Sequence, residues 1–161
     1  MTEQLNLVTG AFGFSGSYVV RELLAAGKKV IGTDLPSTLK NSDVRDTMAR
    51  TGLDLEHPNL TLRPSNLLEK ESLKGLFETP VSHIFHTASL YDYSAPIERL
   101  RKVNVEGTRN LLDSMNGSRA DLQRFVHWST CGVFGKPYTA RHGSKVNVPF
   151  GEDSPSPKNS P

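Results

Sequence analysis

The sequence predicts an α/β protein with a parallel sheet of about five strands, flanked by helices. Apolar runs of four to six residues alternate with longer segments that repeat with a helical period. A turn with regularly spaced glycines joins the first apolar run to the first helical segment. With 161 residues, the chain is long enough for one domain with a core of its own.

The expected strands are short and apolar, and the expected helices carry apolar side chains three and four residues apart. The strands are predicted at residues 5–9, 29–34, 60–63, 81–89 and 124–130. The helices are predicted at residues 14–26, 42–52, 69–78 and 96–115. The run at 81–89 is apolar enough for burial on both faces of the sheet.

Small and polar residues mark the expected helix ends. Gly27 and Gly52 are expected to end the first and second helices, and Ser42 is the expected N-cap of the second. The inner face of the first helix is expected to hold four apolar residues, Val19, Val20, Leu23 and Leu24.

Composition favours a soluble protein without nucleic-acid or membrane partners. The net charge is +2, and the basic residues are scattered. No apolar run approaches the roughly 18 residues of a membrane span, and no signal peptide precedes the first strand. The single cysteine, Cys131, excludes an intrachain disulfide. The cytoplasm is therefore the expected compartment.

The glycine turn predicts a phosphate site. Gly10, Gly13 and Gly16 are spaced three apart in LVTGAFGFSG, between the first expected strand and helix. In dinucleotide-binding turns the first glycine allows a sharp turn, the second lets the backbone approach a pyrophosphate, and the third lets the helix pack closely. The phosphates then meet free N–H groups at the helix N-terminus. A tight turn without a ligand is the alternative.

An acidic residue at the end of the second strand supports the dinucleotide interpretation. Asp34 closes KVIGTD, eighteen residues after Gly16, where its carboxylate can accept hydrogen bonds from both hydroxyls of an adenosine ribose. A carboxylate there repels a 2′-phosphate and no arginine follows it at once, so NAD is favoured over NADP. Lys40 is a nearby positive charge, so NADP stays open as an alternative. An exposed loop aspartate is the alternative.

Four ordered motifs carry a resemblance to a known family. TGAFGFSG, HTAS, NVEGTRNLL and HWSTCGVFG occur in this order between residue 5 and about residue 135. With them the sequence resembles the extended short-chain dehydrogenases/reductases, the group of NAD-dependent nucleotide-sugar epimerases and dehydratases. FHTASLYDYSAP, KVNVEGTRNLLDSM and RFVHWSTCGVFG look most similar to its 3β-hydroxysteroid dehydrogenase-like branch. The resemblance implies a Rossmann-type doubly wound sheet with strand order 3-2-1-4-5.

The resemblance also implies which residues border a bound NAD. The glycine turn would border the pyrophosphate and Asp34 the ribose, while Asn66 replaces the family's usual aspartate at the adenine amino group. Asn104 would lie in the helix behind the cofactor. The implied cofactor residues are Gly10, Gly13, Phe14, Ser15, Gly16, Asp34, Leu35, Asn66, Leu67, Thr87, Ala88, Ser89, Asn104 and Ser129.

The same resemblance assigns one catalytic residue and indicates that others lie outside the chain. Thr130 matches the family's catalytic serine or threonine, whose hydroxyl orients the reacting oxygen. The family's acid/base pair, Y-x-x-x-K, does not occur, because Tyr138 is followed by His142 and Tyr91 by Ala95. The tyrosine and lysine are expected beyond Pro161, and this chain is expected to be inactive alone.

These observations define an expected domain organisation. Residues 1–135 are expected to form the N-terminal part of an NAD-binding domain. Residues 136–161 hold five of the ten prolines and show no sustained period. We expect them to form a loop leading to a catalytic helix and a substrate-binding region that the chain lacks.

Several other residues have structural interpretations. His83 and His86 are three apart on a strand, so they face opposite sides and cannot share a metal, and no Cys/His cluster has zinc spacing. They are interpreted as core or family-pattern histidines. Trp128 is interpreted as a packing residue, and Cys131 as a small residue beside the cofactor rather than a nucleophile.

The expected function is hydride transfer between NAD and a secondary alcohol or ketone in a small-molecule substrate. Two alternatives stay open: a nucleotide-sugar epimerase or dehydratase, and a non-catalytic dinucleotide-binding sensor on the same fold. A homodimer also stays open.

Overall fold

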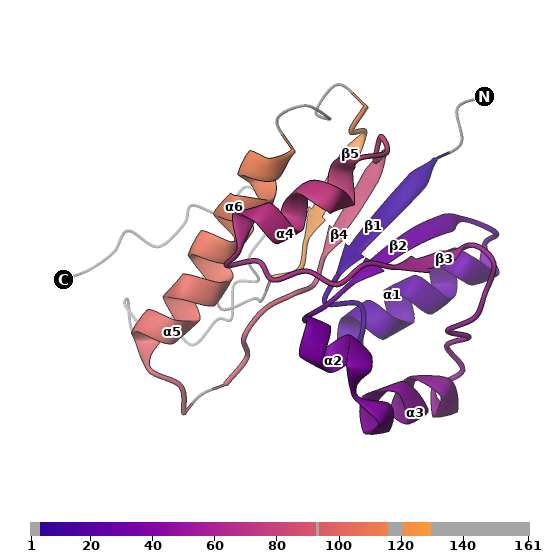
Figure 1. Ribbon diagram of the computed structural model, residues 1–161, viewed down its shortest axis with the longest axis horizontal. Coiled ribbons are helices and arrows are strands. Elements are labelled where there is room, and N and C mark those ends of the chain that lie inside the picture. Colours follow the sequence, from indigo (N-terminus) through magenta and orange to yellow (C-terminus); the bar gives the residue numbers. More distant parts are fainter. Residues whose placement is uncertain (1–3, 93, 116–120, 130–161) are drawn as a thin grey trace, which may run out of the picture. The chain divides into compact units, whose positions relative to one another are not determined.

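The computed structural model describes residues 4–92, 94–115 and 121–129 (Figure 1). The chain divides into two compact units, Met1–Trp128 and Ser129–Pro161, and the first contains all the described helices and strands. The boundary expected at residue 135 lies outside the described residues.

A five-stranded parallel sheet forms the centre of the first unit. Its strands are β1 (Leu5–Thr9), β2 (Lys29–Thr33), β3 (Leu60–Leu62), β4 (His83–His86) and β5 (Arg124–His127). Their order is β3-β2-β1-β4-β5, and every neighbouring pair is parallel. The predicted fold class and strand order are therefore confirmed. Thr9 pairs with Thr33 on one side and His86 on the other, so three carboxyl ends meet at one edge.

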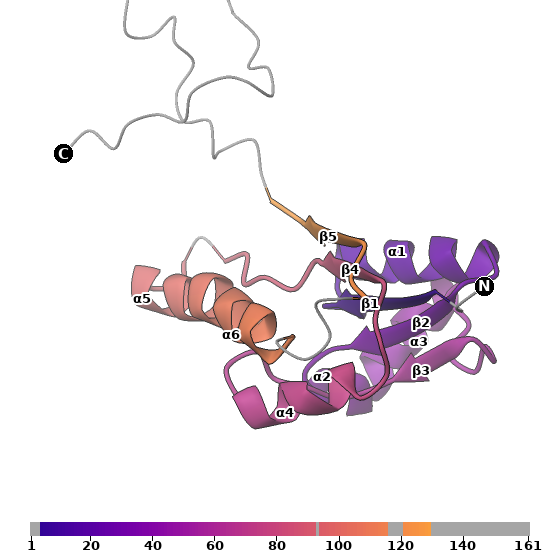
Figure 2. The ribbon, with the colours of Figure 1, turned by 90° about the horizontal axis from the view of Figure 1, so that it is seen from above.

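Helices cover both faces of the sheet (Figure 2). One face carries α1 (Phe14–Ala25), α2 (Pro36–Lys40) and α3 (Ser42–Arg50), whose buried residues pack against Val8 and Val30. The other carries α4 (Lys70–Lys74), the 3-10 turn η1 (Gly75–Phe77) and α6 (Gly107–Ser114), which pack against Leu7 and Ile31. The period-two alternation within β1 and β2 sends neighbouring residues to opposite cores.

The predicted helix at 96–115 is one helical run with three parts. It comprises α5 (Ile97–Arg101), the π-helical segment η2 (Lys102–Glu106) and α6. The Gly107 N–H donates to the carbonyl of Lys102, five residues back, which is the π-helical pattern. Such single π turns inside helices frequently occur at functional sites.

The structure corrects two details of the second predicted helix. Ser42 is not its N-cap. The cap of α3 is Asn41, whose Oδ1 accepts from the N–H groups of Asp43 at 2.9 Å and Val44 at 3.3 Å. The short helix α2, with Pro36 in its first turn, fills the segment before it. Five residues are too few to show a helical period, which is why the sequence did not reveal α2.

The first helix also differs in detail from its prediction. Its buried residues are Gly16, Ser17, Val20 and Leu24, whereas Val19 and Leu23 are half-buried at the margin of the core. Gly27 follows the helix with φ of +69°, and Gly52 follows α3 with φ of +83°, so both glycines stand where the chain leaves a helix, as predicted.

The predicted strand at 81–89 is shorter in the structure. β4 ends at His86, and the residues after it bond to the end of β1 and to η2. The Thr87 hydroxyl donates to the Thr9 carbonyl at 2.7 Å, and Leu90 bonds to the Asn104 side chain. The strand predicted at 124–130 likewise ends at His127.

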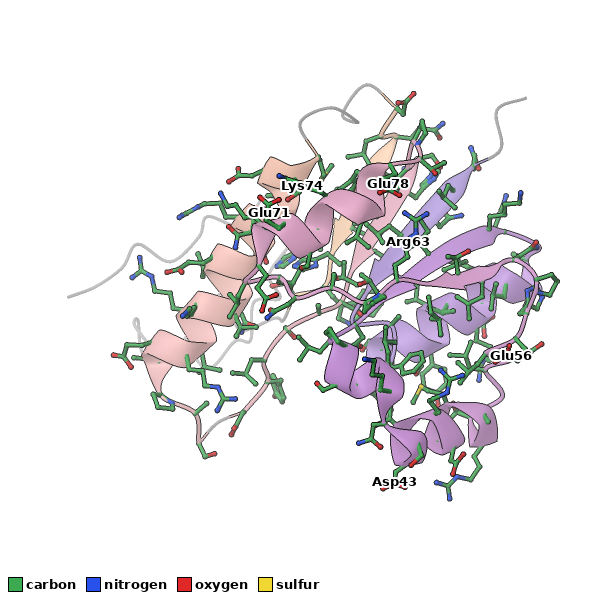
Figure 3. The ribbon with its side chains drawn as sticks, viewed as in Figure 1. Asp43, Glu56, Arg63, Glu71, Lys74 and Glu78 are labelled. Atoms are coloured by element: carbon green, nitrogen blue, oxygen red, sulfur yellow. The ribbon has the colours of Figure 1, made fainter. Side chains whose placement is uncertain are left out.

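An arginine connects the end of β3 to the segment that contains α4 and η1 (Figure 3). Arg63 directly follows β3, donates to the Gly75 carbonyl and lies 3.5 Å from a carboxylate oxygen of Glu78. On α4 itself, Lys74 and Glu71 form an ion pair one turn apart. Arg63 therefore ties β3 to the η1 turn, and the loop of residues 64–69 runs between these anchored points.

Candidate dinucleotide-binding site

A cavity of about 590 Å³ opens at the carboxyl edge of the sheet. It is lined by the turn after β1 and by the loops that follow β2, β3 and β4, and one wall comes from α5 and η2. Nine of the residues predicted to contact a cofactor line it: Gly10, Gly13, Asp34, Leu35, Asn66, Leu67, Thr87, Ala88 and Ser89.

The turn after β1 is closely packed at two glycines. Gly10 has φ of +67°, and a Cβ there would lie 2.8 Å from the Cα of Ala88. A Cβ on Gly16 would lie 2.7 Å from the carbonyl carbon of Gly10 and 2.8 Å from the Thr87 hydroxyl. Real Cβ atoms do not approach backbone this closely, so helix α1 and the β4 loop can meet the turn only at glycine.

Asp34 follows β2 and bonds to the glycine turn. Its Oδ2 accepts from the N–H of Phe12 at 3.0 Å, and its Oδ1 accepts from the N–H of Leu35 at 2.9 Å. Each carboxylate oxygen has two lone pairs, so each keeps one acceptor position. The half-buried carboxylate thus fixes the glycine turn and still offers acceptors to hydroxyl groups in the cavity.

Asn66 forms a turn of its own after β3. Its Oδ1 accepts from the N–H of Leu68 at 3.0 Å, and its Nδ2 donates to Glu69 at 2.8 Å. A Cβ on Gly107 would lie 3.0 Å from the Cβ of Leu67, so this loop packs directly on α6. One lone pair of the Asn66 oxygen remains for a ligand donor.

Asn104 positions the loop after β4 rather than lining the cavity. Its Oδ1 accepts from the N–H of Leu90 at 2.7 Å, and its Nδ2 donates to the carbonyl of Leu90 at 3.0 Å. The residue belongs to η2. The Asn104 side chain thus holds both backbone groups of Leu90. It thereby anchors the C-terminal end of the segment Thr87–Ser89, which lines the cavity.

A buried histidine joins β1, β4 and α6. His86 is 1% exposed, its Nδ1 lies 2.7 Å from the Thr9 hydroxyl, and its Nε2 lies 2.9 Å from the Thr108 hydroxyl. The Thr108 hydroxyl donates to the Asn104 carbonyl, so it accepts from His86 Nε2–H. Nδ1 is then the acceptor, and Thr9 donates to it while accepting from the Ala88 N–H at 3.3 Å.

Burial keeps His86 neutral. Burial, and then the charge of His127, lower the pKa of His86 to about 4. The two imidazole rings are stacked, with centroids 5.4 Å apart. The interpretation of His86 as a core residue is therefore confirmed. Among the described residues, no three or more His, Cys, Asp and Glu side chains are grouped so that they could hold a metal ion.

Phe14, Ser15 and Gly16 do not line this cavity. Gly16 is buried, and Ser129 belongs to the second unit. Phe14 and Ser15 line a separate apolar surface that also includes Tyr18, Phe85 and Trp128. Thr130 and Cys131 lie outside the described residues. Trp128 follows the end of β5 and lines this apolar surface beside Phe85, but it is 49% exposed, so it packs on the sheet only in part.

Two basic residues were missed by sequence reasoning. Arg99 on α5 and Lys102 at the start of η2 both line the cavity. They are three residues apart in a helical run, a spacing that places two side chains on one face. That spacing was visible in the sequence, but only the fold shows that this face meets the cavity.

The fold and the cavity define a Rossmann-type dinucleotide-binding domain. Residues 6–161 match the family described as the NAD dependent epimerase/dehydratase family, and the chain belongs to that family. Among the described residues, no helix is both long and apolar enough to cross a membrane.

Relatives within the family differ in their activities. The chain is 36% identical to cinnamoyl-CoA reductase 1 of Oryza sativa subsp. japonica, over 81% of this chain and 36% of that protein. It is 32% identical to a 3-beta-hydroxysteroid dehydrogenase of Mycolicibacterium neoaurum (79% and 32%) and 30% identical to UDP-glucose 4-epimerase 2 of Oryza sativa subsp. japonica (96% and 36%). The chain thus spans about a third of the length of these curated relatives.

Solved structures agree with the fold. The Bordetella bronchiseptica enzyme WbmH, solved with NAD⁺, is 25% identical with a TM-score of 0.67, covering 84% of this chain and 42% of that one. The epimerase Mth375 of Methanothermobacter thermautotrophicus is 27% identical with a TM-score of 0.66, covering 82% and 37%.

Proposed function

We propose that this chain is the NAD-binding part of an oxidoreductase or epimerase that acts on a secondary alcohol and its ketone. NAD, when bound, supplies the acceptor for a hydride from the substrate carbon. The residues of this chain bind and orient the dinucleotide. The motifs around residues 85–96 and 124–135 favour the hydroxysteroid dehydrogenase-like branch of the family, and the hydroxysteroid dehydrogenase among the relatives supports this choice.

The position of Asp34 is the observation that carries the proposal. Its carboxylate lines the cavity, bonds to the glycine turn and keeps one acceptor position on each oxygen. Two adjacent ribose hydroxyls would donate to these positions, whereas a 2′-phosphate would meet a like charge. This arrangement favours NAD over NADP.

We assign proton transfer to residues that do not line the cavity. Thr130, outside the described residues, would orient the substrate oxygen through its hydroxyl. We propose that a tyrosine and a lysine beyond Pro161 complete the acid/base pair. The 161-residue chain is then a binding unit with little or no turnover of its own.

Calorimetric titration of the 161-residue chain with NAD and NADP tests the proposal. We expect tighter binding of NAD. Asp34→Asn removes the charge and one acceptor, and we expect it to weaken NAD about tenfold while weakening NADP less. Asp46→Asn, an exposed aspartate of α3 that does not line the cavity, is the matched control and should leave both affinities unchanged.

Folding must be separated from binding, because Asp34 also holds the backbone of Phe12 and Leu35. The melting temperature of each variant makes that separation. Tighter binding of NADP than of NAD by the unaltered chain contradicts the proposal, as does a folded chain that binds neither dinucleotide.

A further inference from the structure

Arg99 and Lys102 have no role in the site as proposed so far, yet they line the same cavity as Gly10 and Gly13. Arg99 lies in α5, and Lys102 begins the π-helical segment η2. In Figures 1 and 2, α5 and α2 lie on two sides of the carboxyl edge of the sheet. The cavity therefore has a basic wall from α5 and η2, in addition to the wall that carries Asp34 and Leu35.

The charges of this wall are not neutralised by ion pairs that the structure describes. Within the described residues, each salt bridge joins other side chains, and Asp34 is the only carboxylate on the cavity wall. The Asp34 oxygens bond to backbone N–H groups. The Arg99 charge does reach exposed Asp92, whose pKa is lowered mainly by Ser94 and least by Arg99. Both basic groups are exposed and available to a ligand.

The glycine turn offers a phosphate no charged side chain. It offers a ligand neutral N–H donors, and the first turn of α1, FSGS, contains no basic side chain. A dinucleotide carries two negative charges on its pyrophosphate, and the nearest side-chain charge at the ribose position is that of Asp34, which has the same sign. Arginine and lysine on the facing wall have the charge and the donors that phosphate oxygens accept.

We propose that Arg99 and Lys102 form a phosphate-binding pair that holds a phosphate group of the dinucleotide from the side opposite the glycine turn. This inference rests on the proposed function. The pyrophosphate shared by NAD and NADP and the additional 2′-phosphate of NADP are two sources of the same chemistry. The pair binds whichever phosphate lies between the two walls.

The test is titration of the 161-residue chain and its Arg99→Gln/Lys102→Gln variant with NAD, ADP-ribose, adenosine and NADP. At an ionic strength of about 0.01 M we expect the variant to bind NAD and ADP-ribose about tenfold more weakly, since two exposed charge contacts are lost. At about 0.15 M the difference should shrink, because salt screens exposed charges. Adenosine, which has no phosphate, should bind both proteins equally.

Arg101→Gln/Arg109→Gln is the matched control. Both arginines are exposed, belong to the same helical run and do not line the cavity, and the variant loses the same two charges. If the control weakens NAD as much as the paired variant does, the effect comes from net charge and the proposal is wrong. Equal melting temperatures for the two variants exclude a difference in folding as the cause.

The ligand series distinguishes the remaining outcomes. A loss confined to NADP assigns the pair to the 2′-phosphate, and an equal loss for NAD and ADP-ribose assigns it to the pyrophosphate. A loss for adenosine as large as that for ADP-ribose means that the side chains contact the base, which overturns the proposal. Inorganic pyrophosphate provides a test that needs no dinucleotide. Affinities for pyrophosphate and for NADP that are both unchanged by the two substitutions also overturn the pair, whereas absence of NAD binding by the unaltered chain overturns the proposed function.

Discussion

The carboxyl edge at β1 and β2 and the face over β4 and β5 differ in how closely their side chains and backbone are packed. At the first, Gly10 and Gly16 pack without space for a Cβ, and Asp34 bonds to two backbone N–H groups. At the second, Phe14, Tyr18 and Trp128 are exposed on an apolar surface. The region proposed to bind the dinucleotide is therefore closely packed, whereas the apolar face leaves large side chains exposed.

Under the proposed function, this difference separates binding from catalysis. The part of the site proposed to bind adenosine and the pyrophosphate consists of a turn, a strand end and two loops, and all of these fall within residues 9–103. The expected catalytic residue, Thr130, follows Trp128 by two positions and lies outside the described residues. The part of the site that binds is thus separate in the sequence from the part that would act on substrate.

The largest predicted effect is that of Gly16→Ala at the packed edge. The new methyl group would overlap the backbone of Gly10 and contact the Thr87 hydroxyl at 2.8 Å. Backbone cannot move aside as a flexible side chain can, so we expect a loss of at least about 3 kcal/mol in unfolding free energy. Urea denaturation followed by circular dichroism measures it.

Gly75→Ala is the control for this substitution. Its added methyl group would meet only Glu78 Oε1, at 3.9 Å, and Gly75 lies in the right-handed helical region. We expect no loss, and a gain of up to about 1 kcal/mol through the unfolded state. Equal losses at Gly16 and Gly75 would show that the packing of α1 on the turn is not as close as described.

A smaller, pH-dependent effect is predicted for His86→Gln. The variant loses the two hydroxyl bonds of the ring, and we expect it to unfold about 2 kcal/mol more easily near neutral pH. The folded pKa of His86 is about 4, below the ordinary value of 6.5, so between these values the unfolded chain binds a proton that the folded chain does not. The unfolding free energy therefore falls as pH falls through this window.

The size of that fall distinguishes His86 from other groups. The shift corresponds to up to about 3 kcal/mol, so the advantage of the unaltered chain over His86→Gln should disappear between pH 6.5 and about 4. His83→Gln, at a half-buried residue of the same strand that bonds to Ser82, is the control because it retains His86, and the slope due to His86 should remain in it. A slope unchanged in His86→Gln would mean that burial does not hold the histidine neutral.

The sequence predicts those features that depend on residues close together in the chain, and it does not predict those that depend on how distant elements pack. Gly10 and Asp34 follow from local requirements, a left-handed turn after one strand and an acid at the end of the next, and the strand order follows from the resemblance. The bonds of His86 depend on the β1–β4 register, which puts it beside Thr9. The cavity-facing position of Arg99 and Lys102 depends on how α5 is placed, which periodicity does not specify.

The smallest predicted effect is that of Phe14→Ala on the exposed face. The Phe14 side chain is 85% exposed, and its described ring contact is with Tyr18, at 5.5 Å between centroids. Little apolar area is lost and alanine is the better helix former, so we expect a change below about 0.5 kcal/mol in unfolding free energy.

Phe12→Ala, two residues earlier, is the matched control because Phe12 is buried in the core beside Asp34. We expect it to cost about 3 kcal/mol or more, as core phenylalanines do. The ratio of the two losses, measured by urea denaturation, reports how differently the two regions are packed. A loss at Phe14 comparable with that at Phe12 would show that the apolar face is covered in solution, and the contrast between the two regions would then be wrong.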